Sequence, residues 1–429
     1  MRILIVSYFF PPFNAIGAVR VGKTAKYLRE MGYEVKVISA MDQTLLNTLA
    51  LEIPKTNVIY TKWFNVNKIF EWAFGRKKIA TMGYTAAIEK NSLLRRLAYA
   101  YKIVFNLPDS QIGWYPYAVS AGQSLIRQWR PDVIVASAMP ITSLLVANSL
   151  AKKYGIPWVG ELRDLWVDNP YLSYYPKWRR HFEAKLERRV LGSACGLVSI
   201  SDPLVAHLRD RYTCPVSLVM NGFDPVDYPQ SLEAGHSSEI HIVYTGMIYI
   251  GRRDPSPLFK AMAKLGVDKK RVKVSFYGRY LGTIHSLAMK YDVVDQVFVH
   301  EPVAYRDSLR IQAEADVLLL LLWNDSQEKG SYTGKLFEYL GARRPILAIG
   351  PQDNVATQLI VDRFAGVVFD SMNEEGLLAQ LRAWIVLKKQ GGMLPRLPEA
   401  VSEGYTRREQ TQKLADFLQQ CVGVEKVKS

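Results

Sequence analysis

GSYTGKLFEYLGARRP, residues 330–345, is the most informative segment of this 429-residue chain. The apolar run ADVLLLLLW, residues 315–323, precedes it and is too short to span a membrane. Such a run predicts a strand that is buried on both faces. A polar loop follows at 324–331, a helix is predicted to begin near residue 333 or 334, and PILAIG starts the next buried strand. The segment therefore predicts one strand–loop–helix–strand unit of a parallel sheet.

The predicted helix carries two charged side chains on a different face from its apolar ones. Leu336, Phe337 and Leu340 share the face that would pack on the sheet. Lys335 and Glu338 are three residues apart and share another face. The helix begins at the carboxyl end of a strand, where open α/β sheets bind ligands and where a helix N-terminus attracts phosphate. The segment alone supports two interpretations: a nucleotide site with Glu338 on a ribose, or an ordinary surface Lys–Glu pair.

The bulk composition is that of a folded protein with more than one domain. The chain is too long for one core, and its 49% apolar and 22% charged residues are ordinary values. The cysteines Cys195, Cys214 and Cys421 are scattered, which argues against a disulfide framework or a zinc site and suits a reducing cytosol. We also find no aspartate-rich metal motif and no His-x-x-x-His pair, so no metal is expected.

The net charge of +15 predicts an anionic partner or surface. Nucleic acid, an anionic membrane and a phosphorylated substrate are the candidates, but no nucleic-acid module is present in the sequence. The apolar start after Arg2 is short, ends in two prolines and lacks a cleavage site, so we do not interpret it as a signal peptide. No run approaches the roughly 20 apolar residues of a spanning helix. We therefore expect a cytoplasmic protein that rests on the inner face of the plasma membrane.

The N-terminal half alternates strands and helices. Residues 2–10 predict a buried strand, Gly17 lies in the loop after it, 19–31 predict a helix and 33–40 a second strand. The loop lacks the three-glycine dinucleotide fingerprint, so NAD is not expected. Gly17 either lets the backbone approach a ligand or simply precedes the helix.

The segment 61–105 is unusually basic and aromatic. It interleaves residues such as Trp63, Phe64 and Trp72 with Lys62 and Lys68. Amphipathic segments of this composition lie on anionic membranes, and they also close domains as ordinary helices. Both interpretations stay open for this segment, and the global charge favours the first.

A charged cluster ends another predicted strand of this half. IPWVGELRDLW, residues 156–166, places Glu161, Arg163 and Asp164 at the carboxyl end of the strand. Charged groups there are costly to bury unless they are paired or used, so the cluster is either a site or a set of mutual ion pairs.

The strand–helix alternation restarts after NGFD at 221–224, and we place a domain boundary near Gly222. In the second half, Arg252 and Arg253 follow the strand IHIVYTG. Two guanidinium groups at this position could clamp a diphosphate, and a solvated basic pair is the alternative. The sequence predicts domains at 1–222 and 223–402 and a C-terminal helical segment at 403–429.

Taken in order, these motifs resemble those of the retaining GT-B-fold glycosyltransferases of family 4, in the branch that builds bacterial surface polysaccharides and O-antigens. The resemblance covers nearly the whole chain. It rests on ILIVSYFFPPFNAIGAVR, the LPD…GW…A segment, ELRDLW, NGFD, YTG with a basic loop after it, and GKLFEYLGARRPILA. It implies two Rossmann-like domains facing a cleft, an N-terminal one for the acceptor and a C-terminal one for a nucleotide sugar, with the last helix returning to the N-terminal domain.

The resemblance also implies site residues. Glu338 matches the second glutamate of the paired-glutamate motif of the family, which contacts the ribose. The other residues implied on the donor side are Gly246, Arg252, Arg253, Tyr277, Gly278, Pro302, Thr333, Gly334 and Lys335. Those implied on the acceptor side are Gly17, Ser137, Glu161, Arg163 and Asp164, with the last three as catalytic candidates.

The sequence departs from the family pattern at two places. The first glutamate of the pair should fall at Gly330, and Glu328 is two residues away. The usual acceptor-side histidine is also replaced, by Ser137 at the end of VIVAS. We therefore expect the acceptor proton to go to an acid of the ELRD cluster or to the departing phosphate.

The expected activity is transfer of a hexosyl or N-acetylhexosaminyl group, with retention, from a nucleoside diphosphate sugar to an acceptor hydroxyl. The expected acceptor is a polyprenyl-diphosphate-linked or other glycan in surface polysaccharide synthesis, and no other cofactor is expected. A GT-B-fold sugar-nucleotide epimerase and a non-catalytic nucleotide-sugar-binding protein remain alternatives.

Overall fold

The computed structural model describes residues 1–41, 43, 45–68, 93–169, 175–229, 238–248, 253–279, 281–323, 329–330, 332–391 and 394–428. Arg252, Glu328 and part of the predicted basic aromatic segment, 69–92, lie outside these residues. The chain divides into two compact units. The N-terminal unit holds Met1–Met220 and Gln410–Ser429, and the C-terminal unit holds Asn221–Glu409.

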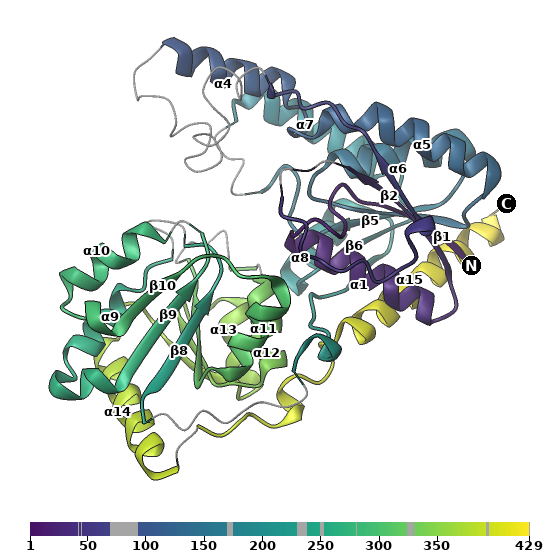
Figure 1. Cartoon of the computed structure of the whole chain (residues 1–429). Coiled ribbons are helices and arrows are strands. Elements are labelled where there is room, and N and C mark those ends of the chain that lie inside the picture. Colours follow the sequence, from purple (N-terminus) through teal and green to yellow (C-terminus); the bar gives the residue numbers. More distant parts are fainter. Residues whose placement is uncertain are drawn as a thin grey trace. The chain divides into compact units, whose positions relative to one another are not determined.

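The N-terminal unit is built on a parallel sheet of seven strands (Figure 1). The strands are β1 (Arg2–Val6), β2 (Glu34–Ala40), β3 (Val58–Thr61), β4 (Val133–Ser137), β5 (Trp158–Leu162), β6 (Gly196–Ser199) and β7 (Val216–Leu218). Their order across the sheet is β3-β2-β1-β4-β5-β6-β7, and every pairing is parallel. This order reverses direction between β1 and β4, which creates the crevice where open α/β sheets bind ligands.

Helices cover both faces of this sheet, as the near-continuous apolar strands require. The helices are α1 (Ile16–Glu30), α4 (Leu93–Phe105), α5 (Tyr115–Gln128), α6 (Thr142–Tyr154), α7 (Lys177–Leu191), α8 (Asp202–Arg211) and α15 (Arg407–Lys428). One core contains buried residues of α5, α6, α7 and α8, among them Leu144 and Leu191. The other contains residues of α1 and α15, among them Leu28 and Leu418. The C-terminal end of the chain thus completes the N-terminal core.

The C-terminal unit repeats the design with six parallel strands. The strands are β8 (Ile240–Thr245), β9 (Val272–Tyr277), β10 (Val297–His300), β11 (Val317–Leu321), β12 (Ile346–Ile349) and β13 (Gly366–Phe369). The helices are α9 (Ser256–Ala263), α10 (Gly282–Lys290), α11 (Tyr305–Glu314), α12 (Gly334–Ala342), α13 (Val355–Asp362) and α14 (Glu374–Gly391). The order β10-β9-β8-β11-β12-β13 reverses between β8 and β11, and the predicted doubly wound α/β fold is confirmed for both units.

Short 3-10 helices join several of these elements. They are η1 (Lys55–Asn57), η2 (Ile112–Trp114), η4 (Pro225–Asp227), η5 (Gly266–Arg271), η6 (Val294–Gln296) and η8 (Glu399–Val401). Among the described helices, none combines the length and the apolar character needed to cross a bilayer.

Two local predictions need correction. The first helix begins at Ile16 rather than at residue 19, so Gly17 lies in its first turn and not in the preceding loop. Its N-cap residue is Ala15, which makes no side-chain capping hydrogen bond, so the sequence has no capping signal at the first turn. Strand β3 was not predicted, because only four residues form it at the edge of the sheet.

Candidate functional site

The C-terminal unit presents the N-terminus of α12 beside the end of a fully buried strand. β11 is buried at all five positions, as its apolar run predicts. Thr333 is the N-cap residue of α12, with an extended backbone, but its side chain makes no capping hydrogen bond. Its Oγ1 atom is buried and has no hydrogen-bond partner among the described residues. The first N–H groups of α12, including that of Gly334, are therefore not capped by Thr333, and a helix N-terminus of this kind attracts an anion.

Lys335 lies in the first turn of α12 and reaches to the end of β8. Its Nζ donates to the hydroxyl of Tyr244 at 2.7 Å and lies 4.0 Å from the centre of the tyrosine ring. Gly246 makes room for it, because a Cβ at that position would come within 2.6 Å of Lys335 Cε. Burial lowers the pKa of Lys335 well below its ordinary value, and the nearby charge of Arg253 lowers it further, against the opposing effect of Glu338. An anion at this point would offset both effects.

Glu338 lies one turn further along α12. Its Oε2 accepts from Gln312 Nε2 of α11 at 3.1 Å, and Gln312 Nε2 also donates to Thr245 Oγ1 at 3.0 Å. Tyr228 donates to the backbone oxygen of Glu338 at 2.6 Å, which fixes this turn of the helix. Burial raises the pKa of the Glu338 carboxyl, although the hydrogen bond from Gln312 and the charges of Arg407 and Lys335 act against the rise. One side of the carboxylate is thus held by the protein.

The remaining donor-side residues fall into two groups. Gly278 packs on Gly246, since a Cβ on Gly278 would meet the Gly246 carbonyl oxygen at 2.1 Å, so both glycines are required by close packing beside Lys335. Tyr277 instead stacks on His300, with ring centroids 4.3 Å apart at the ends of β9 and β10. Pro302 is exposed just beyond β10. The structure gives no contact between this second group and Lys335.

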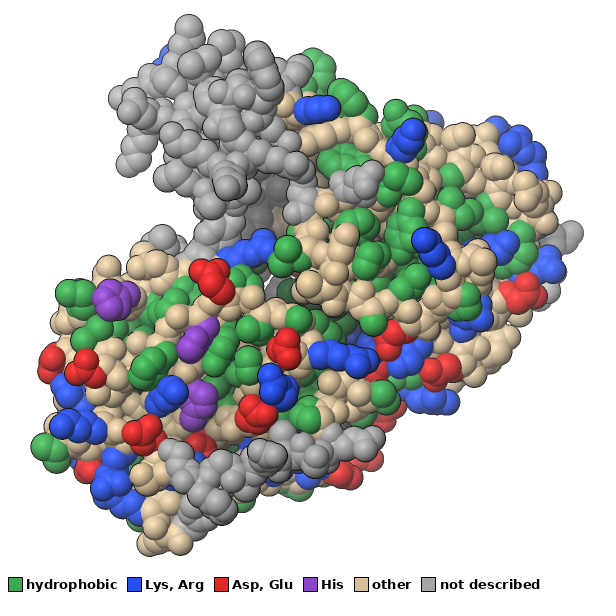
Figure 2. Space-filling model, in the orientation of Figure 1, with side chains coloured by type: hydrophobic (Ala, Val, Ile, Leu, Met, Phe, Trp, Pro, Cys, Tyr) green, Lys and Arg blue, Asp and Glu red, His purple; other side chains and the backbone are tan. Residues whose placement is uncertain are grey.

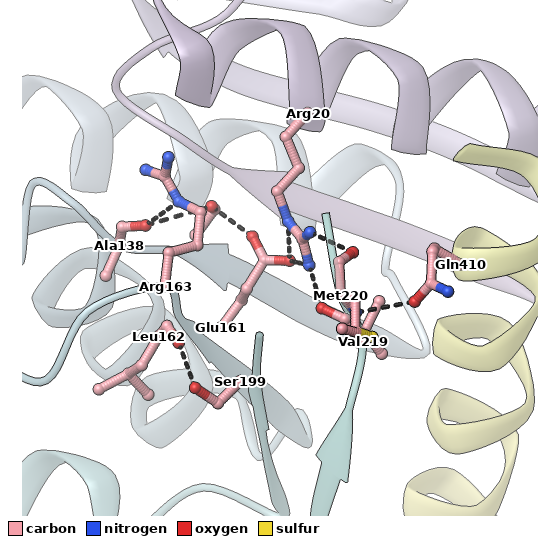
Figure 3. A network of polar contacts seen from close by, with 10 residues as sticks. Arg20, Ala138, Glu161, Leu162, Arg163, Ser199, Val219, Met220 and Gln410 are labelled. Carbon is pink, nitrogen blue, oxygen red and sulfur yellow. Dashed lines mark hydrogen bonds and ion pairs between the residues drawn. The ribbon is translucent and has the colours of Figure 1, made fainter. Parts of the chain in front are cut away.

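On the N-terminal unit, Glu161 forms a buried ion pair that the sequence did not reveal (Figure 3). Arg20 of α1 donates from Nε to Glu161 Oε1 at 2.8 Å. The other two guanidinium nitrogens donate to the carbonyl oxygens of Met220 and Val219, at 2.6 and 2.8 Å. Ser137 donates to Glu161 Oε2 at 2.5 Å. Both carboxylate oxygens are therefore occupied, in a side chain that is 4% exposed.

The environment of Glu161 favours the ionised carboxylate. Burial alone would raise the pKa of Glu161, but the charge and hydrogen bond of Arg20, with the hydroxyl of Ser137, outweigh burial and leave the pKa below its ordinary value. A paired carboxylate of this kind is a weak proton acceptor. The geometry favours a role in which Glu161 joins α1, β4 and β5, rather than the catalytic role predicted from sequence.

Arg163 and Gly17 contact each other. Arg163 donates to the carbonyl oxygens of Ala138 and Met139, at 2.7 and 3.1 Å, and so holds the loop after β4. A Cβ on Gly17 would come within 2.9 Å of the guanidinium, so the glycine leaves room for Arg163 in the position that it occupies. Asp164 differs from its neighbours because its side chain is exposed. Of the three acids and bases predicted in this cluster, Asp164 is the one open to solvent.

The comparisons with known proteins agree with this architecture. Residues 17–227 match the model of Glycosyltransferase Family 4. No curated protein matches the chain in sequence.

Solved structures resemble the chain over nearly its whole length at low sequence identity. HepE from Anabaena, solved in complex with UDP-glucose, is 14% identical, with a TM-score of 0.63, 98% of this chain covered and 100% of that chain. Sucrose-phosphate synthase from Thermosynechococcus elongatus is also 14% identical, with a TM-score of 0.58 and coverage of 100% and 98%. A UDP-N-acetylglucosamine 2-epimerase is 13% identical, with a TM-score of 0.55 and coverage of 99% and 97%. These likenesses establish the GT-B fold, which both enzyme classes share. The sequence match is to the transferase family, so residues 17–227 are similar to the glycosyltransferases of family 4, and the chain as a whole has the GT-B fold.

Proposed function

We propose that the chain transfers a hexosyl or N-acetylhexosaminyl group, with retention of anomeric configuration, from a nucleoside diphosphate sugar to a hydroxyl of a lipid-linked glycan in surface polysaccharide synthesis. The observation that carries the donor half is the arrangement at α12. Three features lie within two turns of α12, at the carboxyl end of a parallel sheet. They are the cationic side chain of Lys335, the helix N-terminus that the Thr333 side chain does not cap, and the carboxylate of Glu338. This is the pattern that a diphosphate followed by a ribose requires.

In this proposal, the residues of the C-terminal unit hold the leaving group. Lys335, Arg253 and the first N–H groups of α12 face the diphosphate, and they stabilise the negative charge that develops when the bond from the sugar to the diphosphate breaks. Glu338 accepts from the ribose hydroxyls with the oxygen that Gln312 leaves free. The new bond forms between the anomeric carbon and the acceptor oxygen. We assign no protein nucleophile.

The acceptor proton has two proposed destinations. One is a phosphate oxygen of the departing diphosphate, and the other is Asp164, the exposed acid of its cluster. Asp164→Asn should lower kcat and remove the acidic limb of its pH profile if Asp164 takes the proton. An unchanged pH profile would mean that the departing diphosphate takes the proton.

The donor site is tested by thermal stabilisation with UDP, GDP, dTDP and ADP. UDP is the first expectation, because HepE was solved with UDP-glucose. We expect one nucleotide to stabilise the wild type and not Glu338→Ala, whereas Glu375→Ala, which removes an exposed carboxylate of α14, should respond like the wild type. If no nucleotide stabilises the protein, or if Glu338→Ala is stabilised equally, the proposed donor site is wrong.

The epimerase alternative predicts a different product. A UDP-N-acetylglucosamine 2-epimerase is among the similar structures, so the fold does not separate the two activities. A transferase releases nucleoside diphosphate only when it glycosylates an acceptor or water, whereas an epimerase changes the sugar and keeps the nucleotide attached. Incubation of the donor without acceptor, followed by NMR of the sugar, distinguishes them. A new sugar nucleotide would favour the epimerase.

A further inference from the structure

Helix α7 buries both of its acidic side chains and exposes only basic charge. Glu183 and Glu187 are 1% and 5% exposed. Glu183 pairs with Arg179, and Glu187 accepts from Tyr212 at 2.9 Å. The exposed charged residues of α7, all of which is described, are Lys177, Arg180, Lys185, Arg188 and Arg189. The outer surface of this helix therefore carries five positive charges and no negative one.

Two large aromatic side chains lie on this outer surface. Trp178 and Phe182 are 58% and 50% exposed and are four residues apart, so they are neighbours on the helix. Lys185 and Arg189 continue the same line at intervals of three and four residues. We call these four residues the α7 stripe. Aromatic rings occupy its N-terminal half and cations its C-terminal half.

The opposite side of α7 is fixed to α4 by a fully buried arginine. Arg179 donates to the carbonyl oxygens of Ile103 and Asn106, at 2.7 and 2.5 Å, and to Glu183 Oε1 at 2.9 Å. These carbonyls belong to the C-terminal end of α4, where a helix leaves its backbone acceptors unpaired and carries a partial negative charge. The α7 stripe is thus presented on a firmly held helix. At the end of α4, Val104 and Phe105 are also exposed.

We propose that the α7 stripe docks the protein on an anionic lipid bilayer, with Trp178 and Phe182 at the headgroup level and Lys185 and Arg189 on the headgroups. Aromatic rings favour the membrane interface, and each cation near an anionic surface adds to the attraction. The contrast with the C-terminal unit supports this assignment, since acidic and basic side chains are interspersed over its visible face (Figure 2). The exposed Val104 favours lipid over nucleic acid, because an aliphatic side chain does not stack on bases. The inference rests on the proposed function, because an enzyme that acts on a lipid-linked acceptor must reach that acceptor at a membrane.

The test is co-sedimentation of the full chain with vesicles of phosphatidylcholine alone or mixed with phosphatidylglycerol. The wild type should bind the anionic vesicles, bind neutral ones weakly, and lose affinity as salt is raised. Trp178→Ser/Phe182→Ser and Lys185→Gln/Arg189→Gln should each weaken binding. For the second pair the loss should be on the order of 30-fold, because each basic residue near such a surface contributes about a fivefold step.

Matched controls come from α14 in the C-terminal unit. Val386→Ser/Leu387→Ser removes two exposed apolar side chains, and Arg382→Gln/Lys389→Gln removes two exposed charges. Both should bind vesicles like the wild type. If the α7 variants bind as the wild type does, or if the controls lose equally, the α7 stripe is not the docking surface.

Two further outcomes separate the inference from its rivals. Binding of the wild type to single-stranded or duplex nucleic acid, without binding to anionic vesicles, would replace the lipid by a nucleic acid and overturn the proposal. Transferase activity on a water-soluble acceptor should survive in the α7 variants, since these residues lie outside the donor site. Activity without vesicle binding in the wild type would overturn this inference alone. Vesicle binding without any transfer would overturn the proposed function alone.

Discussion

Lys335 is a partly buried cation beside Tyr244 and Arg253, and we expect nucleotide binding at the proposed donor site to depend on pH for this reason. In the free protein, burial and Arg253 lower the pKa of Lys335 well below its ordinary value. A bound diphosphate adds negative charge and should raise that pKa again. Binding therefore takes up a proton wherever Lys335 is partly neutral in the free protein, and affinity should fall as pH rises through the lowered pKa.

Titration calorimetry in buffers of different ionisation enthalpy measures this proton uptake. We expect uptake in the wild type at pH values between the lowered pKa of Lys335 in the free protein and its raised pKa in the complex, and little uptake in Lys335→Met. Glu375→Ala serves as the control, because it leaves the first turn of α12 unchanged. Equal uptake by the wild type and Lys335→Met would show that Lys335 does not face the diphosphate.

At the residue scale, the sequence predicted which side chains are present at the strand ends but not which partners they have. Lys335, Glu338 and Glu161 were all predicted from local patterns. Their partners Tyr244 and Arg20 lie 91 and 141 residues away along the chain. Such pairings depend on the order of the strands, which brings residues distant in sequence to one edge of the sheet. Local periodicity does not predict them. One feature of the sequence could have indicated a buried role for Arg20: it is a long cationic side chain on the side of the first helix that faces the sheet.

At the scale of elements, α1 is attached to the sheet by one buried arginine. Arg20 is 3% exposed and joins α1 to β5 through Glu161 and to the residues after β7 through two backbone oxygens. Removing one partner of a buried ion pair leaves the other charge uncompensated, which costs about 3–5 kcal/mol. Arg20→Met should therefore lower the free energy of unfolding by about that amount. The double variant Arg20→Met/Glu161→Leu should lose less than the sum of the two single changes.

Chemical denaturation of the four proteins at several pH values measures this coupling. The lowered pKa of Glu161 contributes stability above its ordinary value of 4.5, and the contribution is lost as pH falls through the folded-state pKa below it. The deficit of Glu161→Leu relative to the wild type should therefore shrink in acid. Additive effects of the two single substitutions would contradict the coupling.

Element positions were predicted best where apolar patterning and end signals agree. The buried run predicted at 315–323 contains β11, and the helix predicted to begin near residue 333 or 334 begins at Gly334. Prediction failed where burial was partial. β3 is a short edge strand with two of its four positions only partly buried. The first turn of α1 carries Gly17, which leaves room for the side chain of Arg163, a residue far away along the chain.

At the scale of the whole molecule, the two units have separate cores, and they should respond separately to ligand and mutation. The core of the C-terminal unit contains residues of β8–β12 and of α9, α10 and α14, whereas α15 contributes Leu418 to the N-terminal core. A nucleotide bound at α12 stabilises the unit that holds it, by an amount set by ligand concentration over Kd. Leu418→Ala removes a fully buried side chain from the other unit, at a cost of about 2–5 kcal/mol.

Differential scanning calorimetry of the full chain should therefore resolve two transitions with independent behaviour. Saturating nucleotide should raise one melting temperature, and Leu418→Ala should lower the other, with little crossover between them. Leu340→Ala, a fully buried position in α12, is the matched control and should lower the nucleotide-sensitive transition instead. A single transition that moves with every perturbation would mean that the units unfold together. In that case stability gained at the donor site would reach the N-terminal core, and nucleotide binding would also stabilise the residues that we propose for the acceptor.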